Sequence, residues 1–288
     1  WRPVPPNVGQ NPLNGVILTY HLAETADTNV LTLEILNETG AVIRTYTNQE
    51  AKDFQRYPGG PPPPEVIPAG AGLNRFAWDF RTEILPDVPG AFVYGDYRGH
   101  QVAPGAYRAR LTLGEAVSEV DIEVVPDPRT DYADADWDAQ QALLRQLEER
   151  LGEVHGAINR MSKVKKQVQS YNELMKEMEG MEEMVDAGKE LIKKIDEWES
   201  DLVERRQRNF QDVINWPSQL NAEYFAIRNK VDTHDPRITQ GVRDRLSDLD
   251  AKWDAHRTAM QQMLEEEIAG YNRMFREKSV PAVITQLK

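Results

Sequence analysis

The sequence of 288 residues contains no cysteine. Disulfide bonds, thiolate catalysis and cysteine-ligated metal sites are therefore excluded, while the redox state of the compartment is left open. No apolar run approaches the roughly 20 residues that a membrane-spanning helix requires. Basic residues are outnumbered, with 34 lysines and arginines against 47 aspartates and glutamates, and the net charge is −13. Because no segment concentrates enough positive charge to neutralise phosphates, we expect no nucleic-acid partner. The lack of a long apolar run predicts that the chain has no membrane span.

Motifs for catalysis are also missing. The five histidines form no HExxH pair, no glycine-rich phosphate loop follows a strand, and no Gly-x-Ser-x-Gly motif is present. Carboxylates are plentiful, but most of those in the helical segments fall outside the apolar seams, where we expect them to be solvated. Residues 131–136 resemble a calcium loop, yet they lack its mid-loop glycine and terminal glutamate. We therefore expect no catalytic, metal or cofactor-binding residues, no cofactor, and a chain that is not itself an enzyme.

What the sequence does contain is two dissimilar patterns, which predict a multidomain β + α protein with domains at 1–128 and 129–288. In the first domain, short runs of alternating apolar and polar residues are separated by turn residues. Six or seven such strands in about 125 residues are typical of an immunoglobulin- or fibronectin-III-like β-sandwich. The expected strands comprise residues 16–22, 31–36, 41–46, 74–80, 105–113 and 117–125.

The second domain repeats an apolar residue every three or four positions, a period that predicts helices packed together. We expect an antiparallel helical bundle with a long helical hairpin. Asp131 or Asp134 can cap the first helix and Ser218 a later one, and a break is expected near Gly180. The predicted seam of the final helix consists of Val242, Leu246, Leu249, Trp253, His256, Met260, Met263, Glu267 or Ile268, Tyr271 and Met274.

Two loops of the first domain are candidates for contact with a neighbour. Residues 53–71 include four consecutive prolines, which favour a stiff segment that is either a docking edge or a rigid surface loop. Residues 86–104 carry aromatic side chains that could stack on a sugar ring, cap the sandwich or face an adjoining domain. The candidate contact surface comprises Trp1, Pro61, Pro62, Pro63, Phe92, Tyr94 and Tyr97.

Several runs in both domains are similar to a known family. They comprise residues 15–17 with Tyr20, 33–36, 40–44, 72–79 and 102–107, followed by residues 127–129, 147–151, 157–160 and 220–224 with Ala226 and Ile227. The first group resembles the sandwich of the flagellar hook-capping type. More closely, both groups resemble the region that follows the β-propeller in bacterial sortilin-like, Asp-box-repeat glycosyl hydrolase-like proteins. Residues 161–203 match no motif of that family.

The resemblance implies a non-catalytic accessory and interaction region. Such a region would support its own N-terminal β-propeller, which this chain does not contain, and could mediate assembly with other protein subunits. The resemblance also implies an exported bacterial protein, periplasmic or secreted. Three alternatives stay open: a carbohydrate-binding module that binds glycan through Tyr94 and Tyr97, part of a hydrolase whose active site lies in the propeller, and a hydrolase in its own right. Because the chain begins Trp-Arg-Pro without a signal-like start, we expect an excised or processed fragment.

Overall fold

The computed structural model describes residues 8–9, 11–26 and 29–280. The chain divides into two compact units. The first, here called the β unit, comprises residues 1–55, 62–84 and 98–131, and the second, the helical unit, comprises residues 56–61, 85–97 and 132–288. Two short segments from the first part of the sequence therefore belong to the helical unit, a feature that a single boundary at residues 128 and 129 does not describe.

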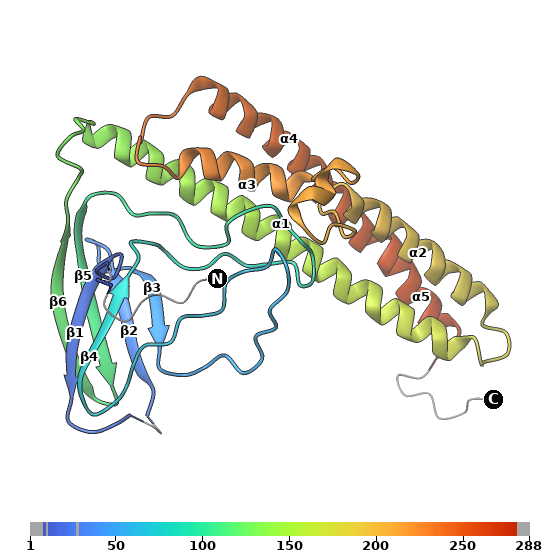
Figure 1. The fold of residues 1–288 in the computed structure, drawn as a ribbon. Helices are drawn as coiled ribbons and strands as arrows, with labels where there is room; N and C mark the ends of the chain where they lie inside the picture. Colours follow the sequence, from blue (N-terminus) through green and yellow to red (C-terminus); the bar gives the residue numbers. More distant parts are fainter. Residues whose placement is uncertain (1–7, 10, 27–28, 281–288) are drawn as a thin grey trace. The chain divides into compact units, whose positions relative to one another are not determined.

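Six strands in the described part of the β unit form two antiparallel sheets (Figure 1). One sheet pairs β1 with β4, and the other has the order β3-β2-β5-β6. The strands lie close to the predicted ranges, so the expected β content is confirmed. They are β1 (Val16–Leu22), β2 (Leu31–Leu36), β3 (Val42–Thr47), β4 (Gly72–Trp78), β5 (Gly105–Leu113) and β6 (Ala116–Val124).

One hydrophobic core serves both sheets, because alternate residues of β1, β2, β4 and β5 point toward it. Leu33 and Ile35 of β2 are buried together with Phe76 and Trp78 of β4. The indole Nε1 of Trp78 donates a hydrogen bond to the carbonyl of Arg81 at 2.9 Å, so its one polar atom is satisfied inside the core. The predicted core role of Trp78 is confirmed.

The predicted hairpin between β2 and β3 is present, and its turn shows why these residues form it. The side-chain Oδ1 of Asn37 accepts hydrogen bonds from the backbone N–H of Thr39 at 3.1 Å and of Ala41 at 2.9 Å. Gly40 has a φ of +81°, a left-handed conformation that a side chain would strain. The turn residues therefore set the register that places Leu33 and Ile35 in the core.

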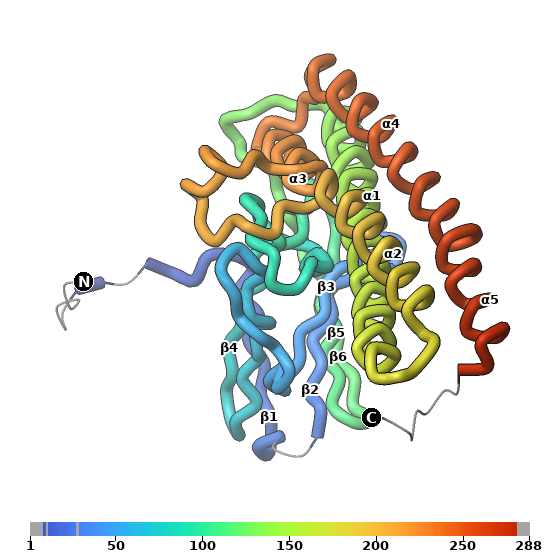
Figure 2. Tube along the Cα trace, turned by 90° about the vertical axis from the view of Figure 1, so that its right-hand side faces the viewer, coloured from blue at the N-terminus to red at the C-terminus, as the bar shows by residue number. Residues whose placement is uncertain are grey.

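The helical unit contains long helices that pack side by side (Figures 1 and 2). α1 and α2 form an antiparallel pair joined by a turn at Gly180, whose φ is +76°, and the expected break is thus confirmed. α4 and α5 run along the same pair (Figure 2). The elements are α1 (Asp134–Met175), α2 (Glu182–Ser200), the 3₁₀ helix η1 (Phe210–Ile214), α3 (Leu220–Val231), α4 (Gln240–Gln262), the π-helix η2 (Met263–Ile268) and α5 (Ala269–Glu277).

The apolar seam predicted for the last helix faces the interior, as the burial of its large side chains shows. Leu246, Leu249, Trp253, Met260, Met263 and Tyr271 are buried, and Val242, His256, Ile268 and Met274 are half-buried. The alternation was ambiguous at Glu267 or Ile268, and this is where the π-helix lies. A π-turn contains an extra residue, so the seam changes phase there. Ile268 is half-buried, while Glu267 is exposed and pairs with Lys194.

The predicted helix caps were wrong at two helices. α1 begins after Ala133 without a side-chain cap, so neither Asp131 nor Asp134 caps it, although Asp134 lies in its acidic first turn. Ser218 does not cap α3, whose N-cap residue is Gln219. The first free N–H groups of α3 donate instead to the backbone carbonyls of Asp201 and Leu202, at 3.2 and 3.1 Å. A distant part of the chain thus performs the task that a cap would perform.

None of the described helices combines the length and the apolar character that crossing a membrane requires. α1 is the longest of them, but its sequence interleaves charged residues with the apolar seam.

Candidate interaction site

The predicted contact residues are distributed over both units and differ in exposure. Trp1 lies outside the described residues. Pro61 belongs to the helical unit, and Pro62 and Pro63 belong to the β unit. Of the three aromatic residues, Phe92 is half-buried, Tyr94 is 66% exposed and Tyr97 is only 2% exposed. The structure therefore leaves Tyr94 as the solvent-facing ring of that loop.

Residues 85–97, here called the docked loop, are built into the helical unit. Val88, Ala91 and Val93 are buried although the segment contains no regular secondary structure. Buried loop carbonyls need donors, because no ladder or helix satisfies them. Helix side chains supply two of these donors. The Nδ1 of His155 lies 2.7 Å from the carbonyl of Pro86, and the Nδ2 of Asn159 donates to the carbonyl of Asp87 at 2.8 Å.

The segment at residues 56–61 packs against the docked loop. The hydroxyl of Tyr57 donates to the carboxylate of Asp87 and lies 3.2 Å from the carbonyl of Val88. Gly59 has a φ of +70°, and a Cβ on it would lie 2.5 Å from the ring of Phe92. The two segments can approach this closely only because residue 59 has no side chain. Together they form one packed surface layer of the helical unit.

An aromatic cluster lies beneath the docked loop. The ring centroids of Tyr97 and Phe225 are 4.9 Å apart in an edge-on arrangement, and the ring of His155 is 6.0 Å from Phe225. Burial lowers the pKa of His155, which favours the neutral imidazole. The neutral form with its proton on Nδ1 fits both neighbours, because Nδ1–H donates to the loop carbonyl and Nε2 accepts from Asn221 at 3.3 Å. His155 is thus a packing and bonding residue of the loop.

A buried ion pair connects α1, α3 and the docked loop. The guanidinium of Arg228 in α3 is fully buried and bonds Glu148 of α1, with Nε at 2.9 Å and Nη2 at 2.8 Å from the same carboxylate oxygen. Its Nη1 donates to the carbonyl of Asp96 at 3.2 Å. Because the charge of Arg228 is both paired and hydrogen-bonded, its burial is tolerated.

A substitution at Gly95 tests whether the packing of the docked loop against Phe225 holds the loop in place. A Cβ at residue 95 would lie 2.5 Å from the ring of Phe225. We expect Gly95→Ala to lower the free energy of unfolding by about 1–3 kcal/mol, because the loop or the ring must move. Urea denaturation followed by circular dichroism measures the loss, and hydrogen exchange of residues 85–97 shows whether the loop detaches.

The matched control is Gly156→Ala in α1, where nothing lies within 4 Å of an added Cβ. Alanine is the better helix former, so this variant should be neutral or more stable by up to about 1 kcal/mol. Equal effects of the two substitutions would show that the contact between Gly95 and Phe225 does not hold the loop.

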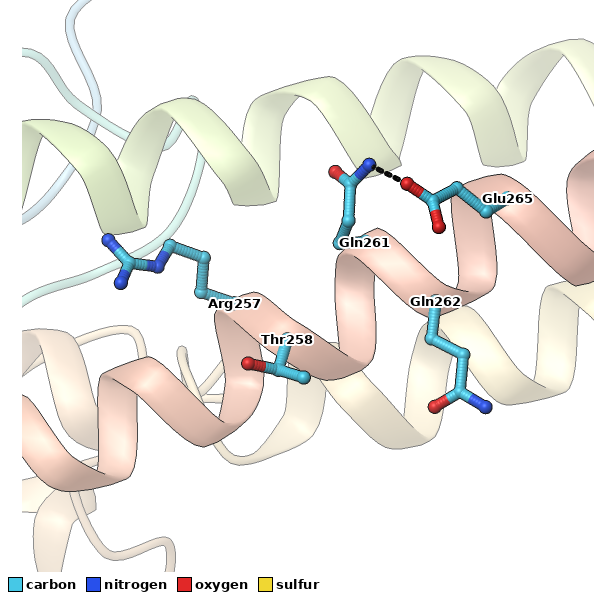
Figure 3. A pocket seen from close by; sticks show the side chains of 5 residues that line it. All are labelled: Arg257, Thr258, Gln261, Gln262 and Glu265. Atoms are coloured by element: carbon cyan, nitrogen blue, oxygen red, sulfur yellow. Dashed lines mark hydrogen bonds between the residues drawn. The ribbon is translucent and has the colours of Figure 1, made fainter.

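Two surface depressions in the helical unit are lined mainly by polar side chains. The first is open to solvent, and its walls come from one helical run, in which Gln261 bonds Glu265 (Figure 3). The second, of about 330 Å³, includes Lys252, His256 and Glu223. Glu223 is already paired with Arg245 at 2.7 Å. Within the described residues, no group of three or more histidine, aspartate or glutamate side chains could hold a metal ion.

Sequence reasoning missed one exposed feature, the 3₁₀ helix η1. Its large apolar residues lie at the surface. The sequence signal is a short run between Asn209 and the break at residues 215–218 that contains Phe210, Val213 and Ile214. So short a run cannot form a long helix with one apolar face buried against other helices.

Comparisons with protein-family models, with curated proteins and with solved structures found no match to this chain. The similarity to the region that follows a β-propeller in sortilin-like proteins therefore stays a prediction from the sequence.

Proposed function

We propose that this chain is a non-catalytic accessory and interaction region of an exported bacterial protein. In this proposal it follows the β-propeller of a sortilin-like, glycosyl hydrolase-like protein, supports that propeller and assists assembly, in the periplasm or after secretion. The β unit acts as an immunoglobulin-like sandwich, and the helical unit acts as an antiparallel bundle with a long hairpin. Any hydrolase activity belongs to the propeller.

The observation that carries the proposal is what three polar helix side chains bind, two of them buried and one, Asn159, half-buried. His155, Asn159 and Arg228 have the chemical groups from which sites are often built, yet each binds a backbone carbonyl of the docked loop. These hydrogen bonds therefore stabilise the conformation of the docked loop. A surface layer fastened in this way suits a rigid support better than a cleft in which reacting groups must stay accessible.

A second argument concerns the exposed aromatic residue. If the docked loop bound a sugar, its aromatic rings would need solvent-accessible faces on which the sugar could stack. Tyr97 is buried against Phe225 and offers no face to a sugar in this structure. Of the two tyrosines that a glycan-binding role would use, only Tyr94 is exposed, and the support function accounts for more of the loop.

The test begins with the coding sequence upstream of Trp1, where we expect Asp-box repeats. The upstream region and this chain are then produced separately and mixed. We expect a one-to-one complex in sedimentation velocity and a higher melting temperature of the upstream region in that complex. An upstream sequence without such repeats would contradict the proposal, and so would turnover of aryl glycosides by this chain alone.

A further inference from the structure

The docked loop has no regular secondary structure, so its place on the helices depends on side chains that bind its carbonyls. Those that donate to it from the helical unit are His155, Asn159, Arg205 and Arg228. The bond from His155 to the carbonyl of Pro86 is the shortest of the four, at 2.7 Å. Of these four side chains, only the imidazole ordinarily changes its charge between pH 5 and 8.

The hydrogen bonds of His155 fit a neutral ring and leave no acceptor for a second ring proton. Because Nδ1–H donates to the loop carbonyl, Nε2 must accept, and it faces the Nδ2 of Asn221 at 3.3 Å. The amide of Asn221 is fixed in this orientation, since its Oδ1 accepts from the backbone N–H of Ala222 at 2.7 Å. A proton on Nε2 would therefore set two donors against each other inside the protein, where water cannot replace the lost bond.

Burial also opposes a positive charge on His155. Its side chain is fully buried, and the ring centroids of Tyr97 and Phe225 lie 6.1 and 6.0 Å from its own. Two groups of the docked loop favour the charged form, namely the carbonyl of Pro86 and the carboxylate of Asp87. Burial outweighs both of them, so the pKa of His155 is lowered.

The other ionisable groups of the packed elements have partners of their own. The pairs are Tyr57 with Asp87, Arg228 with Glu148 and Arg205 with Glu199. The two residues of α3 against the ring, Asn221 and Phe225, carry no charge. Among the described residues, the hydrogen-bond partners of His155 are a carbonyl and an amide, so no carboxylate is bonded to the ring to stabilise its charged form.

We propose that the docked loop is a pH-sensitive switch: in mildly acidic solution His155 takes up a second ring proton, and residues 85–97 detach from the helices. Once the loop detaches, the imidazole meets water and its pKa returns toward the ordinary value of 6.5. Between pH 6.5 and the lowered pKa of the docked ring, the detached state therefore binds more protons than the docked state. The docked state keeps its full stability above pH 6.5 and loses stability as the pH falls through that lowered pKa.

Release by acid goes beyond the proposed support function, in which the loop is part of a rigid surface layer. Detachment would expose the rings of Tyr97 and Phe225, which are buried while the loop is docked. The experiment uses this chain alone, without the upstream region, so the two proposals can fail separately.

Hydrogen exchange of the full chain between pH 7.5 and 5, followed by mass spectrometry on peptides that cover residues 85–97, tests the release. Each exchange rate is divided by the intrinsic rate at the same pH, so that the ratio reports opening of the loop. One proton taken up on opening changes the opening constant by up to about tenfold per pH unit, and we expect the protection of the loop to fall by about fivefold to thirtyfold. The protection of α2 should change by less than about twofold.

Two substitutions have opposite expected effects on this pH dependence. His155→Gln should abolish it, because glutamine stays neutral over the whole range. Asn221→Asp should reverse it, because a carboxylate beside Nε2 raises the pKa of His155 above its ordinary value. The docked state is then most stable below that ordinary value, and protection should rise as the pH falls. Only the change with pH is compared, so a lower protection at every pH does not affect the result.

His256→Gln is the matched control, because His256 is a half-buried histidine on α4 that lines the depression with Lys252. This variant should keep the full fall in protection, and circular dichroism checks that each variant folds. The proposal is overturned if the loop is equally protected at pH 7.5 and 5, or if either His155→Gln or Asn221→Asp shows the fall of the original chain. It is also overturned if His256→Gln abolishes the fall, or if α2 loses protection together with the loop, because acid would then unfold the whole unit.

Discussion

Replacing Arg228 with alanine is expected to lower the free energy of unfolding of the helical unit by about 3–5 kcal/mol. Arg228 is fully buried, and its removal leaves the carboxylate of Glu148 without this cation and the carbonyl of Asp96 without this donor. A charge that loses its partner inside a protein is costly because water cannot replace the partner. Urea denaturation at neutral pH, followed by far-ultraviolet circular dichroism, measures the change.

Arg257→Ala is the matched control for this prediction. Arg257 lies on α4, is exposed and pairs with Asp254 at 2.8 Å across one helical turn. Because water screens such a pair, its loss should cost less than about 1 kcal/mol. A double substitution, Arg228→Met with Glu148→Leu, should recover part of the loss, since no carboxylate then remains at residue 148. Equal losses in Arg228→Ala and Arg257→Ala would show that the buried pair has no special role.

The second large effect is expected in the β unit, where Trp78→Ala should destabilise the fold by about 3–5 kcal/mol. Trp78 is fully buried, and its ring centroid lies 5.6 Å from that of Tyr107 on the opposite sheet. Alanine would leave a cavity between the two sheets and the carbonyl of Arg81 without its indole donor. Hydrogen exchange of the amides in β2 and β5 reports the stability of this unit separately from that of the helices.

Leu73→Ala on the same strand serves as the comparison. Leu73 is exposed, so its truncation removes little buried area and should change the stability by no more than about 0.5 kcal/mol. If Trp78→Ala left the exchange of β2 and β5 as slow as in the original chain, the shared core would not depend on this residue.

The local elements could be predicted because each depends on neighbouring residues. The turn at Asn37 and Gly40 contains its own hydrogen-bond acceptor and its own left-handed residue, so the hairpin is encoded within a few positions. The seam from Leu246 to Tyr271 is likewise encoded by a period of three and four. The phase change at η2 was visible as an ambiguity between two residues, but the sequence did not identify its cause.

The caps and the candidate contact surface could not be predicted in the same way, because their partners are distant in the sequence. The N-terminus of α3 is satisfied by the carbonyls of Asp201 and Leu202, so Ser218 is not needed there. Tyr97 was a plausible surface ring until the structure placed it against Phe225 of α3. Nothing in the loop itself indicates which helix will cover it.

The sequence by itself determined the two kinds of secondary structure, most of their limits and the residues that face each core. These properties follow from the period of apolar residues and from turn chemistry, which act over a few positions. Only the tertiary structure decided that residues 56–61 and 85–97 join the helical unit, that His155 and Arg228 bind loop carbonyls, and that η1 exposes its apolar side chains. Each of these depends on which distant donors, acceptors and rings are brought together, and that choice is made by packing across the whole unit.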